Sequence, residues 1–230
     1  MLDKRLKFWY ILIMKKQITV EQSVEKIKDG MTIMVGGFLS NGSANTILSQ
    51  LSKQKIKNLT IICNDTSYPD KGVGVLFEPK MVKKVITSYV GANPFSQEQM
   101  NDGSLEVEFV PQGTLAERIR CGGCGIGGFL SLTGKGTLAS AGKQTITVDD
   151  KEFLLEKPLR ADIALLGASI CDESGNLWYE GTSRNFNPLM AMAADVVIAE
   201  ADKIVPLGAI QPENVHTPAS LVDFIVNVEN

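Results

Sequence analysis

The sequence predicts an α/β fold: an open, mostly parallel sheet with helices on both faces, extended by extra edge strands and a hairpin. The first observation is a set of short, unbroken apolar runs such as residues 32–35, which are typical of strands covered on both faces. The second is that residues at helical spacing follow these runs, as Ile47, Leu48 and Leu51 do. Strands and helices that alternate in this way form parallel sheets with helical crossovers.

The composition excludes several classes of protein. The chain has 230 residues, of which 44% are hydrophobic and 21% charged, with a net charge of −3. The weakly negative charge offers no basic surface, so we expect no nucleic-acid partner and no membrane partner. The cysteines suit the reduced cytoplasm better than a disulfide scaffold in a chain of this length. They are Cys63, Cys121, Cys124 and Cys171.

Residues 1–13 precede the predicted domain. Three basic residues among the first seven positions lead into an apolar run over residues 8–14, an order typical of a secretory signal peptide. The run is short for that role, no small-residue cleavage site follows, and a bilayer span needs about 20 apolar residues. We interpret residues 1–13 as a non-native or disordered extension before a natural start at Met14, and residues 14–230 as one domain.

The elements of the first half follow in order. Thr19 and Gln22 have the spacing of a capping box, and the helix that they begin is expected to end at Asp29 and Gly30. Ser43 is expected to cap a helix that continues to about residue 54. The other predictions here are strands over residues 32–35, 58–63, 84–90 and 105–110, a short turn or helix over 73–77, and a helix over 95–101.

The second half contains a glycine-rich stretch and a hairpin. Residues 122–136 hold seven glycines, which predicts a flexible functional loop between ordered segments. Residues 144–148 and 152–156 are expected to pair as a hairpin around Asp149 and Asp150. We further expect core strands over residues 161–166 and 195–200, a helix after Pro188 through Ala194, and edge strands over 204–208 and 221–226.

The candidate site begins where the strand over residues 32–35 ends. Gly36 and Gly37 stop the strand, Gly42 follows and Ser43 starts a helix, so the loop aims N–H groups and a helix N-terminus at one point. That arrangement favours an anion, usually a phosphate. The alternative is that the glycines only turn the chain. Their order matches neither the dinucleotide fingerprint nor the P-loop.

Two further polar residues follow predicted strands. Asn64 lies with Asp65 at the carboxyl end of a strand, where open α/β sheets place ligands, or it forms an Asx turn. Gln112 follows the strand over residues 105–110. It either hydrogen-bonds an acyl carbonyl or an amide, or it caps the next helix or faces solvent. The residues alone leave both questions open.

Cys121 and Cys124 have the spacing of a zinc or redox motif. Zinc would need two more ligands, and the only histidine, His216, is remote in sequence, with no second cysteine pair of this spacing. A thioredoxin-like motif would lie at a strand-to-helix turn, whereas this pair is expected after a helix. We interpret both cysteines as small packing residues and expect no metal site.

The segment from Asp29 to Gly42 closely resembles the signature of the alpha subunit of family I coenzyme A transferases, which include the acetate, butyrate and acetoacetate CoA-transferases. Residues 111–120 and parts of residues 172–216 resemble the same subunit, so the likeness covers roughly residues 16–227. One departure is Ala44, where relatives usually have a proline that would pre-set the first helical turn.

The resemblance implies a site and a partner. CoA, as a substrate and not a permanently bound cofactor, is expected at Gly36, Gly37, Phe38, Leu39, Ser40, Asn41 and Gly42, with Asn64 and Gln112 supporting the substrate site. In this family a glutamate attacks an acyl-CoA and then carries CoA as a thioester until a second acid takes it. That glutamate lies in a Ser-Glu-Asn-Gly motif of the beta subunit, and this sequence has no such motif.

We therefore expect no catalytic residue in this chain, although Glu180 and Glu213 are candidates on bare chemistry. The expected enzyme is a hetero-oligomer with a beta subunit, which moves CoA between a short-chain acyl-CoA and an acid such as acetate, butyrate or acetoacetate. Two competing functions are a sugar-phosphate isomerase or hydrolase on a similar fold, which would need its own acid–base pair, and a non-catalytic CoA-binding subunit.

Overall fold

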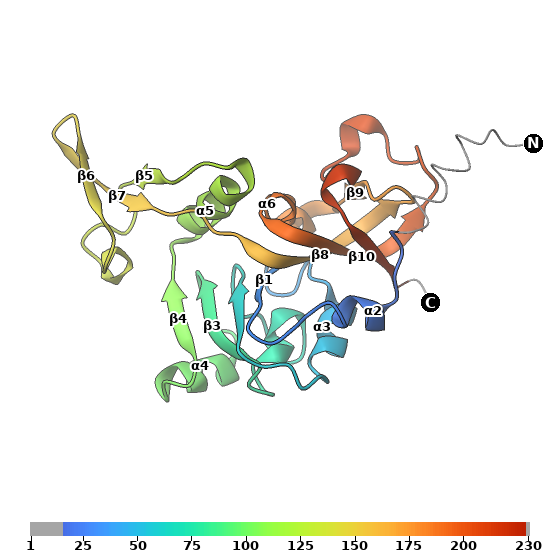
Figure 1. Cartoon of the computed structure of the whole chain (residues 1–230), viewed down its shortest axis with the longest axis horizontal. Helices are drawn as coiled ribbons and strands as arrows, with labels where there is room; N and C mark the ends of the chain where they lie inside the picture. Colours follow the sequence, from blue (N-terminus) through green and yellow to red (C-terminus); the bar gives the residue numbers. More distant parts are fainter. Residues whose placement is uncertain (1–15, 229–230) are drawn as a thin grey trace, which may run out of the picture.

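The computed structural model describes residues 16–228, and most of its strands form one large sheet (Figure 1). These strands are β1 Thr32–Val35, β2 Leu59–Ile62, β3 Val82–Thr87, β4 Glu106–Phe109, β8 Ala161–Asp172, β9 Leu177–Trp178, β10 Ala194–Val205 and β11 Phe224–Asn227. Their order is β11-β10-β8-β1-β2-β3-β4, with all neighbours parallel, and β9 pairs antiparallel with β8. The predicted open, mostly parallel sheet is confirmed.

Helices cover both faces of this sheet. They are α2 Val20–Val24, α3 Asn45–Leu51, α4 Pro94–Asn101, α5 Gln112–Cys124 and α6 Asn187–Met192, with 3₁₀-helices η1 Gly72–Leu76, η2 Leu138–Ser140, η3 Gly181–Arg184, η4 Pro212–Asn214 and η5 Ala219–Leu221. Successive residues of a strand point to opposite faces. Ile33 therefore joins the apolar layer that contains α2, α3 and η1, whereas Met34 joins the layer that contains α5 and α6.

Several predicted boundaries differ from the structure. Thr19 and Gln22 do form the capping box of α2, but this helix ends at Val24 rather than at Gly30. β8 and β10 each run for 12 residues. The edge strand predicted over residues 204–208 is therefore wrong, because its first residues belong to β10 and the rest form a turn.

The extension predicted over residues 1–13 lies outside the described residues. Within residues 16–228, every helix is too short or too polar to cross a membrane. The single domain expected over residues 14–230 stays a prediction.

A second, small sheet stands apart from the large one (Figure 1). Its strands are β5 Phe129–Ser131, β6 Thr145–Val148 and β7 Lys151–Glu156, in the order β5-β7-β6. β6 and β7 are antiparallel and join through Asp149 and Asp150, both with positive φ, as a tight hairpin turn requires. The predicted hairpin is confirmed. We call residues 126–157, which contain this sheet, the arm.

The glycine-rich stretch over residues 122–136 is not the single loop that was predicted. α5 continues through Gly122 and Gly123 to Cys124, and Gly125 ends it in the left-handed conformation typical of glycine after a helix. Gly122 fits inside the helix because a Cβ there would overlap the carbonyl oxygen of Leu159. Close packing of α5 thus explains the first glycines of the stretch.

The chain order gives the large sheet a switch point between β1 and β8. From β1 the chain moves through β2 and β3 to one edge at β4, and from β8 it moves through β10 to the other edge at β11. Open α/β sheets bind ligands beyond the carboxyl ends of strands at such a point. The glycine loop over residues 36–42 directly follows β1 and therefore lies there.

Candidate functional site

The glycine loop is a tight hairpin. The N–H of Phe38 donates to the carbonyl of Asn41, and the N–H of Asn41 donates to the carbonyl of Phe38, both at 3.0 Å. Leu39 and Ser40 between them have φ of 46° and 75°, as a two-residue hairpin turn requires. Phe38 is 46% exposed, whereas the glycine pair at 36–37 is buried. A ligand can meet the tip of this loop but not its first two glycines.

Most N–H groups of the loop bind acceptors within the protein, so the predicted convergence of free N–H groups on an anion is wrong. The N–H of Gly37 donates to Oδ1 of Asn185 at 3.0 Å, and the N–H of Leu39 donates to the carboxylate of Asp65 at 3.1 Å. The two hairpin bonds occupy a further pair. These bonds fix the shape of the loop and satisfy backbone groups that the fold removes from water.

Glu200 of β10 occupies the N-terminus of α3. Its carboxylate accepts from the N–H groups of Thr46 at 3.0 Å and Ile47 at 2.8 Å. Burial raises the pKa of Glu200, and these two hydrogen bonds work against the rise. Ser43, predicted to cap this helix, instead donates its hydroxyl to the carbonyl of Gly36 at 2.8 Å. The anion expected at this helix N-terminus is thus a side chain of the protein itself.

The glycines of the loop make room for neighbouring protein. A Cβ on Gly36 would overlap Oδ1 of Asn187, and one on Gly42 would overlap the carbonyl oxygen of Ser183. Ser183 lies in η3 and Asn187 is the first residue of α6. Nδ2 of Asn187 also donates to the carbonyl of Gly42 at 2.9 Å. The loop is therefore held against a segment more than a hundred residues away in sequence.

A polar chain joins the three predicted parts of the site. Nε2 of Gln112 donates to Oδ1 of Asn64 at 2.5 Å, and Nδ2 of Asn64 donates to Oδ2 of Asp65 at 2.6 Å. Asp65 then accepts from the N–H of Leu39 in the loop. Gln112 does not cap α5, because the N-cap residue of that helix is Pro111. The Asx turn is formed by Asp65 and not by Asn64.

A cavity of about 290 Å³ lies beside this junction. Its lining is largely apolar, with two side-chain amides. The lining residues are Phe38, Gln112, Gly113, Ala116, Asn185, Phe186 and Leu189. Pockets that combine apolar walls with a few placed polar groups are typical ligand sites.

Other candidate residues lie away from the cavity. Glu180 directly precedes η3 and Glu213 lies in η4; both are exposed and neither lines the cavity. Cys121 is buried, as a packing residue should be, but Cys124 is exposed, so that interpretation was wrong for Cys124. No group of three or more metal-ligating side chains occurs among residues 16–228.

Sequence reasoning missed Asn185 and Asn187 as parts of the site. Each asparagine supplies a donor and an acceptor, which suits it to hold a loop with free backbone groups of both kinds. The available signal was two asparagines on either side of Phe186, just before Pro188. That pattern does not reveal the partner, because the contacts span about 145 residues of sequence.

Comparison of the sequence with known proteins identifies one family. The family model described as coenzyme A transferase matches residues 17–228. The chain belongs to the coenzyme A transferase family. It is 47% identical to the acetate CoA-transferase subunit alpha of Escherichia coli K12, covering 92% of this chain and 96% of that one. It is 50% identical to the acetoacetyl-CoA:acetate/butyrate CoA transferase alpha subunit of Clostridium acetobutylicum, covering 92% and 97%. Within the family this is a transferase subunit of the alpha type.

Solved structures of CoA-transferases share the fold. An acyl-CoA transferase from Escherichia coli O157:H7, in a thioester complex with CoA, matches with a TM-score of 0.83 at 23% identity, over 91% of this chain and 46% of that chain. Glutaconate CoA-transferase from Acidaminococcus fermentans matches with a TM-score of 0.81 at 17% identity, over 93% and 76%. This chain thus spans less than half the length of the first of these structures.

Proposed function

We propose that this chain, with a beta subunit, moves CoA between a short-chain acyl-CoA and a carboxylic acid such as acetate, butyrate or acetoacetate. The observation that carries the proposal is the junction of the glycine loop, Asn64 and Gln112 at the switch point of a CoA-transferase sheet. The names of the two alpha-subunit relatives support this class of acid.

In this proposal the tip of the glycine loop binds CoA and the adjacent cavity receives the acyl group. Among the described residues, Ser40 and Gly42 have loop N–H groups without a protein acceptor, so these can donate to a substrate oxygen. Gly36 and Gly37 act indirectly, by letting the loop pack as it does. The cavity is small for a ligand pocket, which suits a short acyl chain.

Gln112 is placed to bind the acyl carbonyl. Its Nε2 carries two protons, and one is donated to Asn64, which leaves the second for the carbonyl oxygen. Asn64 is buried and held by Asp65, so the amide of Gln112 is oriented before substrate arrives. A donor aimed at the oxygen stabilises the negative charge that develops there when the carbonyl is attacked.

The nucleophile in this proposal is a glutamate of the beta subunit. Its carboxylate attacks the thioester carbonyl, the C–S bond breaks, and an acyl-glutamyl anhydride and CoA thiolate form. The thiolate then attacks the glutamyl carbonyl and releases the first acid, which leaves a glutamyl-CoA thioester. The second acid reverses these steps, so no metal and no resident cofactor takes part. We place the enzyme in the cytoplasm, in keeping with four free thiols.

The function is tested by adding the beta chain to this one. The assay follows acetyl-CoA with butyrate or acetoacetate as acceptor, first with this chain alone and then with the beta chain that carries Ser-Glu-Asn-Gly. We expect turnover only in the mixture, and its loss when the partner's glutamate is changed. Turnover by this chain alone, with host enzyme excluded, would contradict the proposal and direct attention to Glu180 and Glu213.

The site is tested by Gln112→Ala in the assembled enzyme. We expect kcat/KM to fall by about 100-fold, because the variant loses one donor to the acyl carbonyl oxygen. The fold should stay intact, because Gln112 is exposed. Gln54→Ala is the matched control, since Gln54 is an exposed glutamine remote from the cavity. Equal kinetics of the two variants would show that Gln112 does not bind the reacting group.

A further inference from the structure

We infer that the arm is the surface on which the beta-type subunit docks. This inference rests on the proposed function, because that function requires a second polypeptide at the site. It goes further by naming the part of this chain that the partner covers.

The arm exposes apolar side chains that have no cover in this chain. Leu132 is 58% exposed and Leu138 is 96% exposed, and Leu130, Val148 and Ile126 add to the same segment. A small sheet of three short strands needs one face covered to be stable on its own. Contiguous apolar surface that remains exposed on a folded chain commonly marks a docking site.

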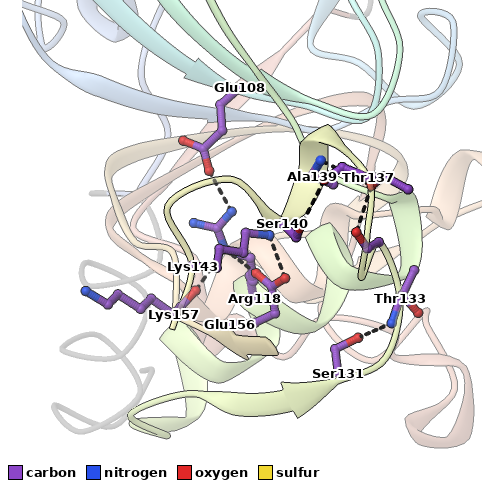
Figure 2. Close-up of polar contacts among 11 residues, drawn as sticks. Glu108, Arg118, Ser131, Thr133, Thr137, Ala139, Ser140, Lys143, Glu156 and Lys157 are labelled. Atoms are coloured by element: carbon purple, nitrogen blue, oxygen red, sulfur yellow. Dashed lines mark hydrogen bonds and ion pairs between the residues drawn. The ribbon is translucent and has the colours of Figure 1, made fainter. Parts of the chain in front are cut away.

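A buried charged cluster fixes the arm to the body of the molecule (Figure 2). Arg118 of α5 donates to Glu108 of β4 at 2.7 Å and to the carbonyl of Lys157, at the base of the arm, at 2.8 Å. Nε of Arg118 also lies 3.9 Å from the carboxylate of the buried Glu156 in the arm, and Lys143 of the arm pairs with the same carboxylate at 2.5 Å. Burial works against the charged form of Glu108, but the hydrogen bond and charge of Arg118, aided by Lys84, hold its pKa below the ordinary value. Loss of one partner of such a pair leaves a charge uncompensated, so the cluster holds the base of the arm against α5 and β4.

Hydrogen bonds shape the turn that carries Leu138 (Figure 2). The hydroxyl of Thr137 donates to the carbonyl of Gly134 at 2.7 Å and accepts from the N–H of Ala139 at 3.2 Å. The hydroxyl of Ser140 donates to the carbonyl of Thr137 at 2.7 Å. Leu138 therefore lies on a turn that is closed by hydrogen bonds of its own residues.

A hollow of about 620 Å³ lies between the arm and the edge of the large sheet. Leu138 and Phe109 form part of its wall, and Phe109 is itself 47% exposed. The charged groups of the cluster also line it, but they pair with one another, so they attract no particular ion. Leu138 and Phe109 leave part of this wall apolar and open to a side chain of a partner.

The position of the arm favours the beta subunit as its occupant. α5 carries Gln112 at its first residue and leads to the arm at its other end, and its 13 residues span about 20 Å. A standard interface buries about 800 Å² on each partner, which is wide enough to cover both ends. The acyl-CoA transferase with this fold has more than twice the matched length in one chain, and relatives of this chain's own length are named as subunits.

The charge of the arm fits a hydrophobic contact. Its basic residues Lys135, Lys143, Lys151 and Lys157 balance its acidic residues Asp149, Asp150, Glu152 and Glu156. With no net charge to attract a polyanion or a cation, apolar contact is the main attraction that the arm offers.

The test is a double variant, Leu132→Glu with Leu138→Glu, in the full chain. We expect its Kd for the purified beta chain, measured by calorimetry, to rise at least about 100-fold, because two buried charges would face an apolar partner. Leu207→Glu is the matched control, since Leu207 is 57% exposed but follows β10, far from the arm, and its Kd should stay within about three-fold. Equal Kd values for the wild type and the double variant would overturn the inference.

Hydrogen exchange supplies a readout that needs no variant. Adding the beta chain to the wild type should slow exchange over residues 126–148 and leave residues 203–209 unchanged. Exchange over the arm could instead slow as the concentration of this chain rises, without any beta chain. That result would show that a second copy of this chain covers the arm, and it would also overturn the inference. Turnover separates the two proposals. If the wild-type mixture turns over and the arm variant still assembles normally, only the proposed docking surface is wrong. If the wild-type mixture assembles without turnover, the proposed function is wrong.

Discussion

At the scale of single residues, asparagine holds the candidate site together. Oδ1 of Asn185 accepts from the N–H of Gly37, and its Nδ2 donates to the carbonyl of Asn41 at 2.9 Å. One side chain thus ties both ends of the glycine loop, which aspartate or serine cannot do with the same pattern of donors and acceptors. Gly42 allows this contact by lacking a Cβ, which would lie 3.0 Å from Nδ2 of Asn185, and Gly36 likewise makes room for Asn187. The loop owes its shape to this segment before any ligand binds.

His216 gives a prediction for pH at the same scale. Its Nδ1 accepts from the N–H of Tyr179 at 3.1 Å, so this nitrogen must be unprotonated. Burial and the charge of Arg184 lower its pKa from the ordinary 6.5. The unfolded chain therefore binds a proton more readily below pH 6.5, and stability should fall as pH falls from 6.5 towards the lowered value.

His216→Asn keeps an acceptor near this N–H but cannot titrate. Thermal melting between about pH 7.5 and 5 should show a smaller loss of Tm for the variant than for the wild type. Equal pH dependence of the two proteins would show that the Tyr179–His216 bond does not depend on protonation.

At the scale of elements, the sequence predicted most strands and helices of the large sheet, but it did not predict β5 or β9 and misplaced several ends. Gly167 looks like a strand end, yet it lies within β8. The position requires glycine, because a Cβ there would come within 2.6 Å of the backbone of Ser43. Gly122 looks like loop, yet it lies within α5 against the chain at Leu159. Both glycines are required by a contact made across the fold, and local propensity carries no information about such contacts.

Two glycines of α5 offer a matched test. Gly122→Ala should destabilise the chain by about 1–3 kcal/mol, because its Cβ would meet the backbone carbonyl of Leu159, which is not free to move. Gly113→Ala should cause no loss, because no atom lies within 4 Å of its Cβ and alanine favours helix. Denaturant unfolding of both variants measures the difference. A stable Gly122→Ala protein would show that α5 can shift away from the arm's base.

At the scale of the whole molecule, the parallel sheet and its two covered faces could be predicted, because buried runs and helical spacing are local signals. The strand order could not, since the runs in β1, β2 and β8 are all short and apolar and none specifies its neighbour. The glycine loop, Asn64 and Gln112 could be selected because each follows a strand. Their junction depends on that order, together with Asp65 and the asparagines of the distant segment.

The last prediction concerns how the molecule unfolds. The two apolar layers share the strands of the large sheet, with Ile33 in one layer and Met34 in the other, so neither layer can open without exposing the other. The arm shares little of this core, since most side chains of β5 and β6 are partly or fully exposed. We therefore expect native-state hydrogen exchange in rising denaturant to give β1, β8 and β10 one common opening free energy, equal to that of global unfolding. Amides of β6 should open at a lower free energy, through separation of the hairpin from the body.

If β10 and β11 instead opened at a lower free energy than β1 and β2, the sheet would divide at its switch point, and residues 14–230 would be two cooperative units. If β6 opened only at the free energy of β1, the arm would unfold together with the large sheet, held there by the charged cluster around Arg118.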